Sequence, residues 1–248
     1  MYKAYENFLF QNDKYIQKQR AAYIAALSHD LKIPTLAQIR ALELIASGEL
    51  GGLSKEQNEI INLTLDSCKS VYDMLSTILT TYKYENKDVA LNMQKIEVSQ
   101  LLNNCFLKFS KDICYKKLKI KVVSENGPCY LFADEVQIKK AFENLIDYCI
   151  SLAYANSSVE SKINVSDNNI IISFIFDSPN GKKLEELLDE YSSLNFDKIG
   201  GGLGLYLTRQ VIAAHNGDIS FNIKKPEFNI CSIKLPSIKD CKIPAFSY

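Results

Sequence analysis

Two amphipathic stretches in the first third of the chain constrain its fold more than any other feature. The second stretch repeats apolar or aromatic residues at intervals of four and three: Ile61, Leu65, Cys68, Tyr72, Leu75, Leu79 and Tyr82. The first stretch carries a similar stripe with one polar member: Ile24, Leu27, Leu31, Pro34, Gln38, Ala41 and Ile45. This spacing predicts two helices joined by the glycine-rich break 47–54, where Ser54 and Gln57 are typical of a helix start.

A hairpin of two such helices cannot bury both of its apolar seams alone. A second copy of the chain would bury them by completing a four-helix bundle, so we expect a homodimer. Packing of the hairpin against the second half of the same chain is the alternative.

The composition limits the number of domains and the kinds of partner and compartment that the chain can have. The 248 residues are enough for two modest domains, and the 29 basic and 29 acidic residues give no general affinity for nucleic acid or anionic membranes. The seven cysteines are scattered and form no Cys-x-x-Cys pair, which favours free thiols in the reducing cytoplasm. No apolar run approaches the roughly 20 residues of a membrane span, and no signal-peptide pattern opens the chain.

The first helical stretch contains a histidine with unusual neighbours, in the segment Ser28-His29-Asp30-Leu31-Lys32-Ile33-Pro34. A carboxylate beside an imidazole can hold one ring nitrogen as a hydrogen-bond donor, and a proline removes a backbone donor and bends the helix. This combination suits a histidine that acts as a nucleophile. A chance histidine beside a proline kink would give the same pattern.

A glycine-rich segment far downstream decides between these interpretations. Gly200-Gly201-Gly202-Leu203-Gly204-Leu205 leads into an apolar-striped helix, 206–215, where backbone N–H groups can approach a polyphosphate. With both segments, roughly residues 15 to 237 of the chain resemble a two-component sensor histidine kinase.

The resemblance implies specific roles for the histidine segment. His29 would accept a phosphoryl group from ATP, and Asp30 would orient and deprotonate its ring. Lys32 would lie close to the incoming γ-phosphoryl, where negative charge develops. The phosphoryl group would then pass to an aspartate on a response-regulator receiver domain.

The resemblance also implies an ATP-binding domain in the second half. Asn144 would contact Mg²⁺ and nucleotide, and Asp177 would accept the adenine amino group. The other implied nucleotide contacts are Gly181, Gly200, Gly202, Leu203, Gly204 and Leu205.

The chain departs from the family pattern in this half. Tyr148 stands where the family has a second asparagine for Mg²⁺, and a phenol is a poor ligand for that ion. Ser151 replaces a basic residue, and Pro179 replaces the first glycine of the Asp177 loop. The alternative interpretation is therefore a non-catalytic histidine phosphotransfer or pseudokinase dimer that no longer uses ATP.

These patterns predict an α+β chain in which a dimerising helical hairpin precedes an α/β sandwich of the histidine kinase and Hsp90-like type. The expected parts are a helical lead-in 1–20, the hairpin 21–88, the ATP-binding domain 91–237 and a tail 238–248. Expected strands are 119–123, 130–132, 163–165, 170–176, 218–223 and 229–235. Expected helices of the second half run from the cap Asp134 to about Tyr154, over 184–191 and over 206–215. His215 ends the last of these, where we expect the helix dipole to favour it.

Overall fold

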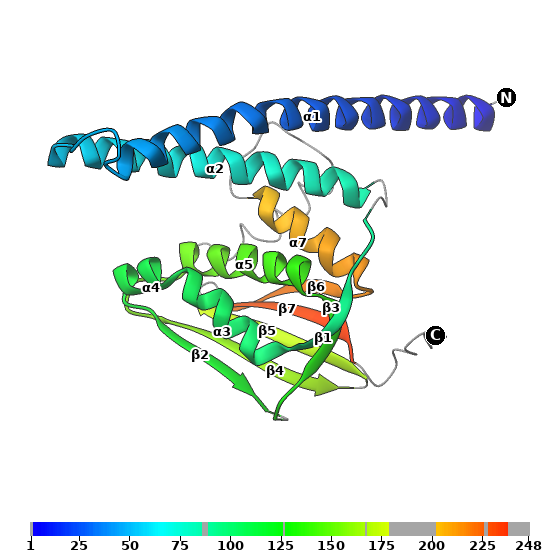
Figure 1. The fold of residues 1–248 in the computed structure, drawn as a ribbon. Coiled ribbons are helices and arrows are strands. Elements are labelled where there is room, and N and C mark those ends of the chain that lie inside the picture. The colour runs from blue at the N-terminus through cyan, green and yellow to red at the C-terminus, as the bar shows by residue number, and fades with distance from the viewer. Residues whose placement is uncertain are drawn as a thin grey trace, which may run out of the picture. The chain divides into compact units, whose positions relative to one another are not determined.

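The computed structural model describes residues 2–85, 89–125, 127–166, 168–178, 202–225 and 228–237 (Figure 1). Within these ranges the side chains of 2–14, 17, 18, 20, 85, 202–203, 222–225 and 228 are not described. The chain divides into two compact units, Met1–Asp88 and Val89–Tyr248. The expected helix 184–191 lies outside the described residues. None of the described helices combines the length and the apolarity needed to cross a bilayer.

The first unit is a helical hairpin of α1 (Tyr2–Ala46) and α2 (Lys55–Glu85). The expected lead-in is continuous with α1, which also runs through Pro34. The predicted start of α2 is confirmed, because the Ser54 N–H donates to Gln57 Oε1 at 2.8 Å and the Gln57 N–H donates to Ser54 Oγ at 3.2 Å. These reciprocal bonds form a capping box that satisfies two backbone donors of the first turn.

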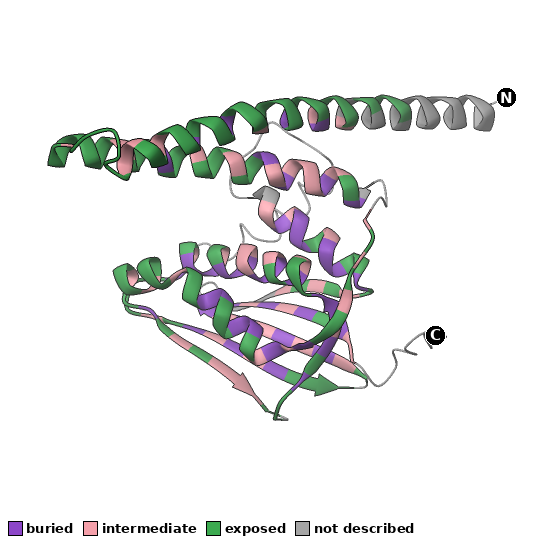
Figure 2. Cartoon of the chain, viewed as in Figure 1, coloured by how far each residue is buried: buried purple, intermediate pink, exposed green. Residues whose placement is uncertain are grey.

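The two helices of the hairpin use their predicted stripes differently (Figure 2). On α2 every residue of the predicted stripe is at least half-buried, and Leu65 and Leu75 are buried. On α1 the side chains of Leu27 and Leu31 remain 43% and 54% exposed. A neighbouring row of α1 is buried instead: Ala25, Ser28, Thr35 and Ile39. The α1 stripe of the sequence therefore lies beside the face that the hairpin buries.

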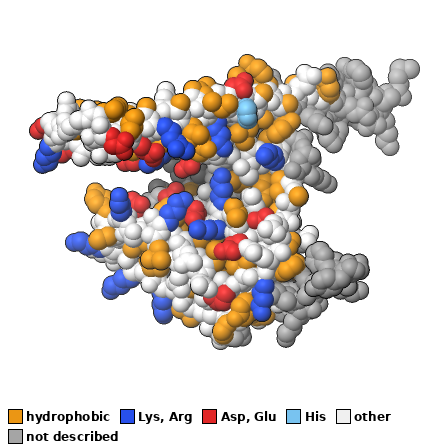
Figure 3. Space-filling model, viewed as in Figure 1, with side chains coloured by type: hydrophobic (Ala, Val, Ile, Leu, Met, Phe, Trp, Pro, Cys, Tyr) orange, Lys and Arg blue, Asp and Glu red, His pale blue; other side chains and the backbone are white. Residues whose placement is uncertain are grey.

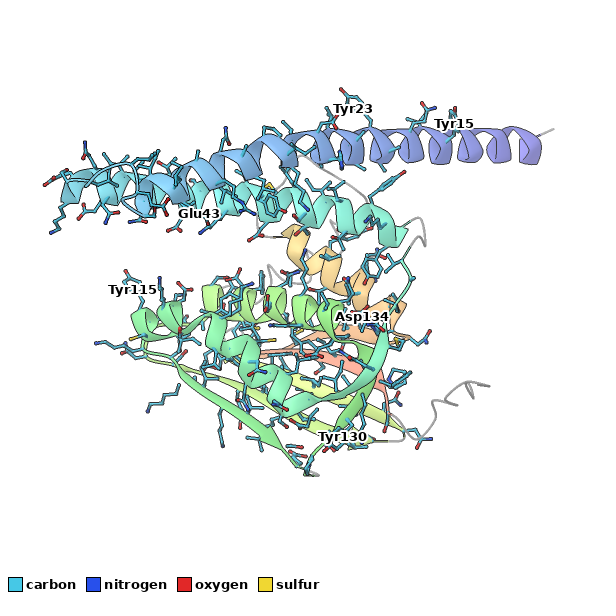
Figure 4. The ribbon with its side chains drawn as sticks, viewed as in Figure 1. Tyr15, Tyr23, Glu43, Tyr115, Tyr130 and Asp134 are labelled. Carbon is cyan, nitrogen blue, oxygen red and sulfur yellow. The ribbon has the colours of Figure 1, made fainter. Side chains whose placement is uncertain are left out.

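Polar contacts also join the two helices of the hairpin. Glu43 on α1, labelled in Figure 4, accepts an ion-pair contact from Lys69 of α2 at 3.3 Å. Both side chains are about half exposed, so solvent screening leaves this pair a small share of the hairpin's stability. The hairpin is consequently held mainly by the side chains that are buried between its two helices.

The second unit is an α/β sandwich, as predicted. Its elements are β1 (Met93–Glu97), α3 (Val98–Lys108), α4 (Ser110–Lys116), β2 (Lys119–Ser124), β3 (Tyr130–Asp134), α5 (Glu135–Leu152), β4 (Ser158–Ser166), β5 (Asn169–Asp177), α7 (Gly202–Ala214), β6 (Asp218–Lys225) and β7 (Phe228–Pro236). Five of the described strands form a sheet in the order β2-β4-β5-β7-β6. Among these five, β2 and β4 pair in parallel and the other neighbours pair antiparallel. Strands β1 and β3 form a separate antiparallel pair.

The core of this unit lies between the five-stranded sheet and the helices that cover one of its faces (Figures 1 and 2). Strand β5 alternates half-buried and buried residues, as expected for a strand with one face on the core. Phe174 of β5 meets Phe142 of α5 edge to face, with ring centroids 6.4 Å apart. Both rings are fully buried, so they fix α5 against the centre of the sheet.

His215 connects the end of α7 to the start of α5. Its ring is only 4% exposed; Nδ1 lies 2.8 Å from the Val211 carbonyl, and Nε2 accepts the Asp134 N–H at 3.0 Å. These two bonds require a neutral ring with its proton on Nδ1. Burial lowers the pKa of His215, and it outweighs the raising effects of the Val211 carbonyl and the Asp134 carboxylate. The expectation that the helix dipole explains this histidine was therefore wrong, because the dipole favours the protonated form.

Asp134 caps α5, as predicted (Figure 4). Its Oδ1 accepts the Gln137 N–H at 3.1 Å, and its Oδ2 accepts the Asn92 N–H at 2.9 Å. One residue therefore joins the first turn of α5, the segment before β1 and the His215 ring.

We predict that acid weakens the second unit through His215. Because the folded-state pKa lies below the ordinary value of 6.5, the unfolded chain binds the proton first as the pH falls. Stability should be independent of this group at pH 8 and should fall below pH 6.5, by at most about 1.4 kcal/mol per pH unit. Urea unfolding between pH 8 and 5 measures the slope, and His215→Gln is the comparison. Identical slopes in the two proteins would contradict the prediction.

Candidate functional site

His29 stands on the surface of the hairpin. Its side chain is 66% exposed, and its Nδ1 lies 3.3 Å from Oδ1 of Asp30, which is itself 79% exposed. With Nδ1 turned toward the carboxylate as donor, Nε2 keeps its lone pair and has no hydrogen-bond partner among the described residues. Figure 3 shows exposed histidine surface, in pale blue, among hydrophobic side chains of the helical unit. The arrangement offers a nucleophilic nitrogen to a reactant in solution.

The helix around His29 has an altered backbone hydrogen-bond pattern. Pro34 has no N–H, so the Asp30 carbonyl lacks the partner that a helix normally supplies. One residue later, the buried Thr35 hydroxyl donates to the Leu31 carbonyl at 2.7 Å.

Lys32 lies between the two helices of the hairpin rather than in open solvent. Its side chain is half-buried, and its Nζ lies 4.8 Å from the centre of the Tyr72 ring of α2. This is a cation–π contact. We expected Lys32 beside an incoming phosphoryl group, and in the structure it contacts Tyr72 instead. The sequence predicted Tyr72 only as a member of the apolar stripe of α2.

In the second unit, Asn144 of α5 contacts the start of α7. Its Nδ2 donates to the Gly204 carbonyl at 3.0 Å. A side chain at position 204 would bring a Cβ within 3.3 Å of Asn144 Cγ, so glycine permits this close approach. The Thr208 hydroxyl lies 2.9 Å from the same Gly204 carbonyl and 3.2 Å from the Ala141 carbonyl. The amide and the hydroxyl together fix α7 on α5.

The other glycines and leucines that we expected to contact the nucleotide are described only in part. Gly202 is the first residue of α7, and Leu205 is 2% exposed in the core. The side chain of Leu203 is not described, and Gly181 and Gly200 lie outside the described residues. The structure thus brings Asn144, Gly204 and the first turn of α7 together.

Asp177 ends strand β5 with an exposed side chain. Its carbonyl accepts the Tyr154 N–H at 3.2 Å, so the backbone beyond α5 holds the end of the strand. Ser178, the next residue, is fully buried. The exposed carboxylate is available to accept hydrogen bonds from a ligand.

The family pattern has an asparagine at position 148 for Mg²⁺, and neither Tyr148 nor its neighbours can take over that role. Tyr148 is half-buried one turn after Asn144, and burial raises the pKa of its phenol well above the ordinary value. Partial burial and the neighbouring Asp112 of α4 raise the pKa of Asp147. The Asp147 carboxylate therefore lies within electrostatic reach of Asp112 of α4, whereas the Asn144 side chain contacts Gly204 of α7. The exposed Ser151 hydroxyl donates to the Tyr148 carbonyl at 2.8 Å.

A lysine that sequence reasoning missed holds the far end of α5. The Lys116 ammonium donates to the carbonyls of Ile150, Ser151 and Ala153 at 2.9, 2.7 and 3.2 Å. The Ile150 and Ser151 carbonyls belong to the last turn of α5, which leaves them without helical backbone partners, and Ala153 directly follows the helix. No local signal reveals this contact, because α4 lies more than 30 residues before the carbonyls it caps.

The oxygen donors in the described part do not suit a tightly held Mg²⁺. No cluster of three histidine, cysteine, aspartate or glutamate side chains occurs among the described residues. Asn144 donates through Nδ2, which leaves its Oδ1 as one amide ligand, and the Tyr148 phenol is protonated. A phosphate-bearing nucleotide fits better than a metal ion. The N-terminus of α7 suits an anion, and Gly204 carries no side chain that would hinder its approach.

Comparison with known proteins places this geometry in context. No protein-family model matches the chain. The sensor protein EvgS of Escherichia coli O157:H7 is 28% identical over 211 residues, which cover 81% of this chain and 17% of EvgS. Other curated relatives are sensor histidine kinases from Bacillus subtilis and Escherichia coli. The chain spans only a small part of the length of EvgS and 37% of the Bacillus subtilis kinase YvrG.

Solved structures agree on the fold. Full-length ShkA in complex with AMPPNP superposes with a TM-score of 0.71 at 16% identity, over 86% of this chain and 45% of ShkA. The histidine kinase AdeS of Acinetobacter baumannii gives a TM-score of 0.58 at 19% identity, over 85% of this chain and 98% of the AdeS chain. In sequence and in fold, the chain resembles the two-component sensor histidine kinases.

Proposed function

We propose that the chain is a protein histidine kinase that phosphorylates His29 with ATP and passes the phosphoryl group to an aspartate of a response regulator. The observation that carries this proposal is the exposed imidazole with Nδ1 turned toward the Asp30 carboxylate, on a helical hairpin. The kinase relatives and the AMPPNP complex of ShkA support it. The six described cysteines are free thiols, which supports a cytoplasmic location.

Residues of the second unit would hold the nucleotide. Asp177 would accept the adenine amino group, and the α7 N-terminus from Gly202 to Gly204 would face the phosphates. Gly181, Gly200, Leu203 and Leu205 complete the proposed site. Asn144 would hold Gly204 in place and could offer Oδ1 to Mg²⁺.

The residues of the hairpin would prepare the acceptor. ATP supplies the phosphoryl group: its bond to the bridging oxygen of ADP breaks while a nitrogen–phosphorus bond forms at the ring. Asp30 holds Nδ1 as a donor, so Nε2 attacks and Asp30 stabilises the positive charge that develops on the ring. The Lys32 ammonium would offset the negative charge of the phosphoryl group.

We predict that His29→Gln abolishes phosphorylation, since glutamine keeps polarity but has no nucleophilic nitrogen. Asp30→Asn should keep the fold and slow phosphorylation roughly tenfold or more, because an amide does not favour the charged ring. Incubation with γ-labelled ATP, followed by acid and base treatment of the label, measures both effects. Label that persists on His29→Gln would remove this residue from the mechanism.

A second candidate function is a histidine phosphotransfer or pseudokinase dimer that no longer uses ATP. The half-buried, protonated Tyr148 favours it, since this phenol stands where the family places a metal-binding amide. The glycine at position 204 favours the kinase, because the first turn of α7 carries no side chain there and Asn144 still fixes its backbone.

We predict weak ATP binding that depends little on Mg²⁺. Loss of one metal ligand and its charge-assisted contacts should cost about 1–3 kcal/mol, or roughly tenfold to a hundredfold in affinity. Tyr148→Asn should increase both affinity and Mg²⁺ dependence, and Asp177→Ala should abolish binding. Calorimetry with a non-hydrolysable ATP analogue, with and without Mg²⁺, decides the matter. Tight, metal-dependent binding by the natural sequence would show that Tyr148 does not impair the Mg²⁺ site. No binding at millimolar nucleotide would favour the phosphotransfer function.

We also propose that the hairpin forms a homodimer. The α1 stripe of Leu27 and Leu31 remains exposed beside the row that the hairpin buries. On α2, Ile60 and Val71 are likewise 63% and 48% exposed. Exposed apolar rows on both helices are what a second hairpin would cover in a four-helix bundle.

We predict that Leu27→Glu shifts the protein to monomer, because the change buries a charge in the proposed seam. Leu44→Glu is the matched control: Leu44 is also 43% exposed and on α1, but it lies about 100° around the helix from Leu27. Sedimentation equilibrium over a range of protein concentrations measures the effect. Equal dimerisation of the two variants would place the interface elsewhere.

A further inference from the structure

The Tyr72 ring holds the ammonium group closest in sequence to His29. Lys32 Nζ lies 4.8 Å from the ring centre, within the roughly 6 Å over which a cation and an aromatic face attract each other. Both side chains are half-buried. None of the ion pairs among the described residues involves Lys32. The ring is therefore the contact that fixes this cation.

Lys32 and His29 are neighbours on the helix surface. Residues three apart on an α-helix have Cβ atoms about 5–6 Å from each other and differ by about 60° around the axis. His29 points to solvent, whereas Lys32 reaches across to α2. The cation is therefore held within one helical turn of the imidazole, without covering it.

We propose that Tyr72 is a positioning residue: it stores the Lys32 ammonium beside His29 and releases it to the phosphoryl group that His29 receives. The inference rests on the proposed role of His29 as phosphoacceptor. An uncharged ring suits this task, because it holds a cation weakly. A phosphoryl group carries up to about two negative charges and forms stronger, charge-assisted hydrogen bonds with an ammonium. A carboxylate at position 72 would retain the lysine and repel the phosphoryl group.

NMR of the full chain can show, without ATP, whether Lys32 leaves the Tyr72 ring for a phosphoryl group on His29. Phosphoramidate transfers its phosphoryl group to an exposed imidazole: a nitrogen–phosphorus bond forms at the ring, and the original one breaks with release of ammonia. Before phosphorylation, the ring current of Tyr72 should move the Lys32 ε-methylene protons upfield. After phosphorylation of His29, this upfield shift should be lost. Protons that are unshifted at the start, or that do not change, would overturn the proposal.

Variants separate the aromatic face from simple packing. Tyr72→Phe keeps the ring, whereas Tyr72→Leu keeps apolar bulk without a π face. The rate of His29 phosphorylation by phosphoramidate should fall about twofold to fivefold in Tyr72→Leu and remain unchanged in Tyr72→Phe. In a Lys32→Met background, Tyr72→Leu should have no further effect, since the cation is gone. An unchanged rate in Tyr72→Leu, or an equal loss in Tyr72→Phe, would contradict the proposal.

The experiment also distinguishes failure of this inference from failure of the kinase. Without ATP use, γ-labelled ATP would leave His29 unmodified, yet phosphoramidate would still modify it and move the Lys32 resonances. If phosphoramidate modifies His29 and the Lys32 resonances stay fixed, the inference fails while the kinase proposal stands. If phosphoramidate leaves His29 unmodified in the folded chain, the proposal that the Lys32 ammonium helps His29 to accept a phosphoryl group is refuted.

Discussion

The contact between α5 and α7 determines how the second unit can work. α5 is fixed on the sheet by Phe142 and capped by Asp134, and α7 is then fixed on α5. At one end of α7, Asn144 and Thr208 bond the Gly204 region. At the other end, His215 bonds the Asp134 backbone. Both ends of α7 are thus bonded to α5 or to its cap residue, so the N-terminus of α7 has a defined position relative to the core.

Features that depend on local sequence were predictable. The Ser54 and Gln57 capping box, the Asp134 cap and the two C-terminal strands follow from neighbouring residues, and the structure confirms them. The α2 stripe was also predictable, because its four–three spacing spans the whole helix. The sandwich fold followed from the order of these elements together with the family resemblance.

Features that depend on distant partners were not predictable. Strand β1 has a single buried residue, Ile96, so it lacks the alternation that reveals a strand, and only its pairing with β3 defines it. The burial of His215 and the reach of Lys32 to Tyr72 likewise depend on residues of other elements. In α1, two adjacent rows could face α2, and only the packed hairpin shows that the row with Ser28 does so.

The cap at the end of α5 has a consequence for how this helix can change during evolution. The last turn of α5 contains no basic residue, and its terminal carbonyls are nevertheless neutralised by Lys116 of α4. A cation supplied from a separate helix makes the electrostatic balance of that turn independent of its own side chains. Position 151 therefore needs no charged side chain to pair with these carbonyls, since Lys116 already does so while a serine stands there.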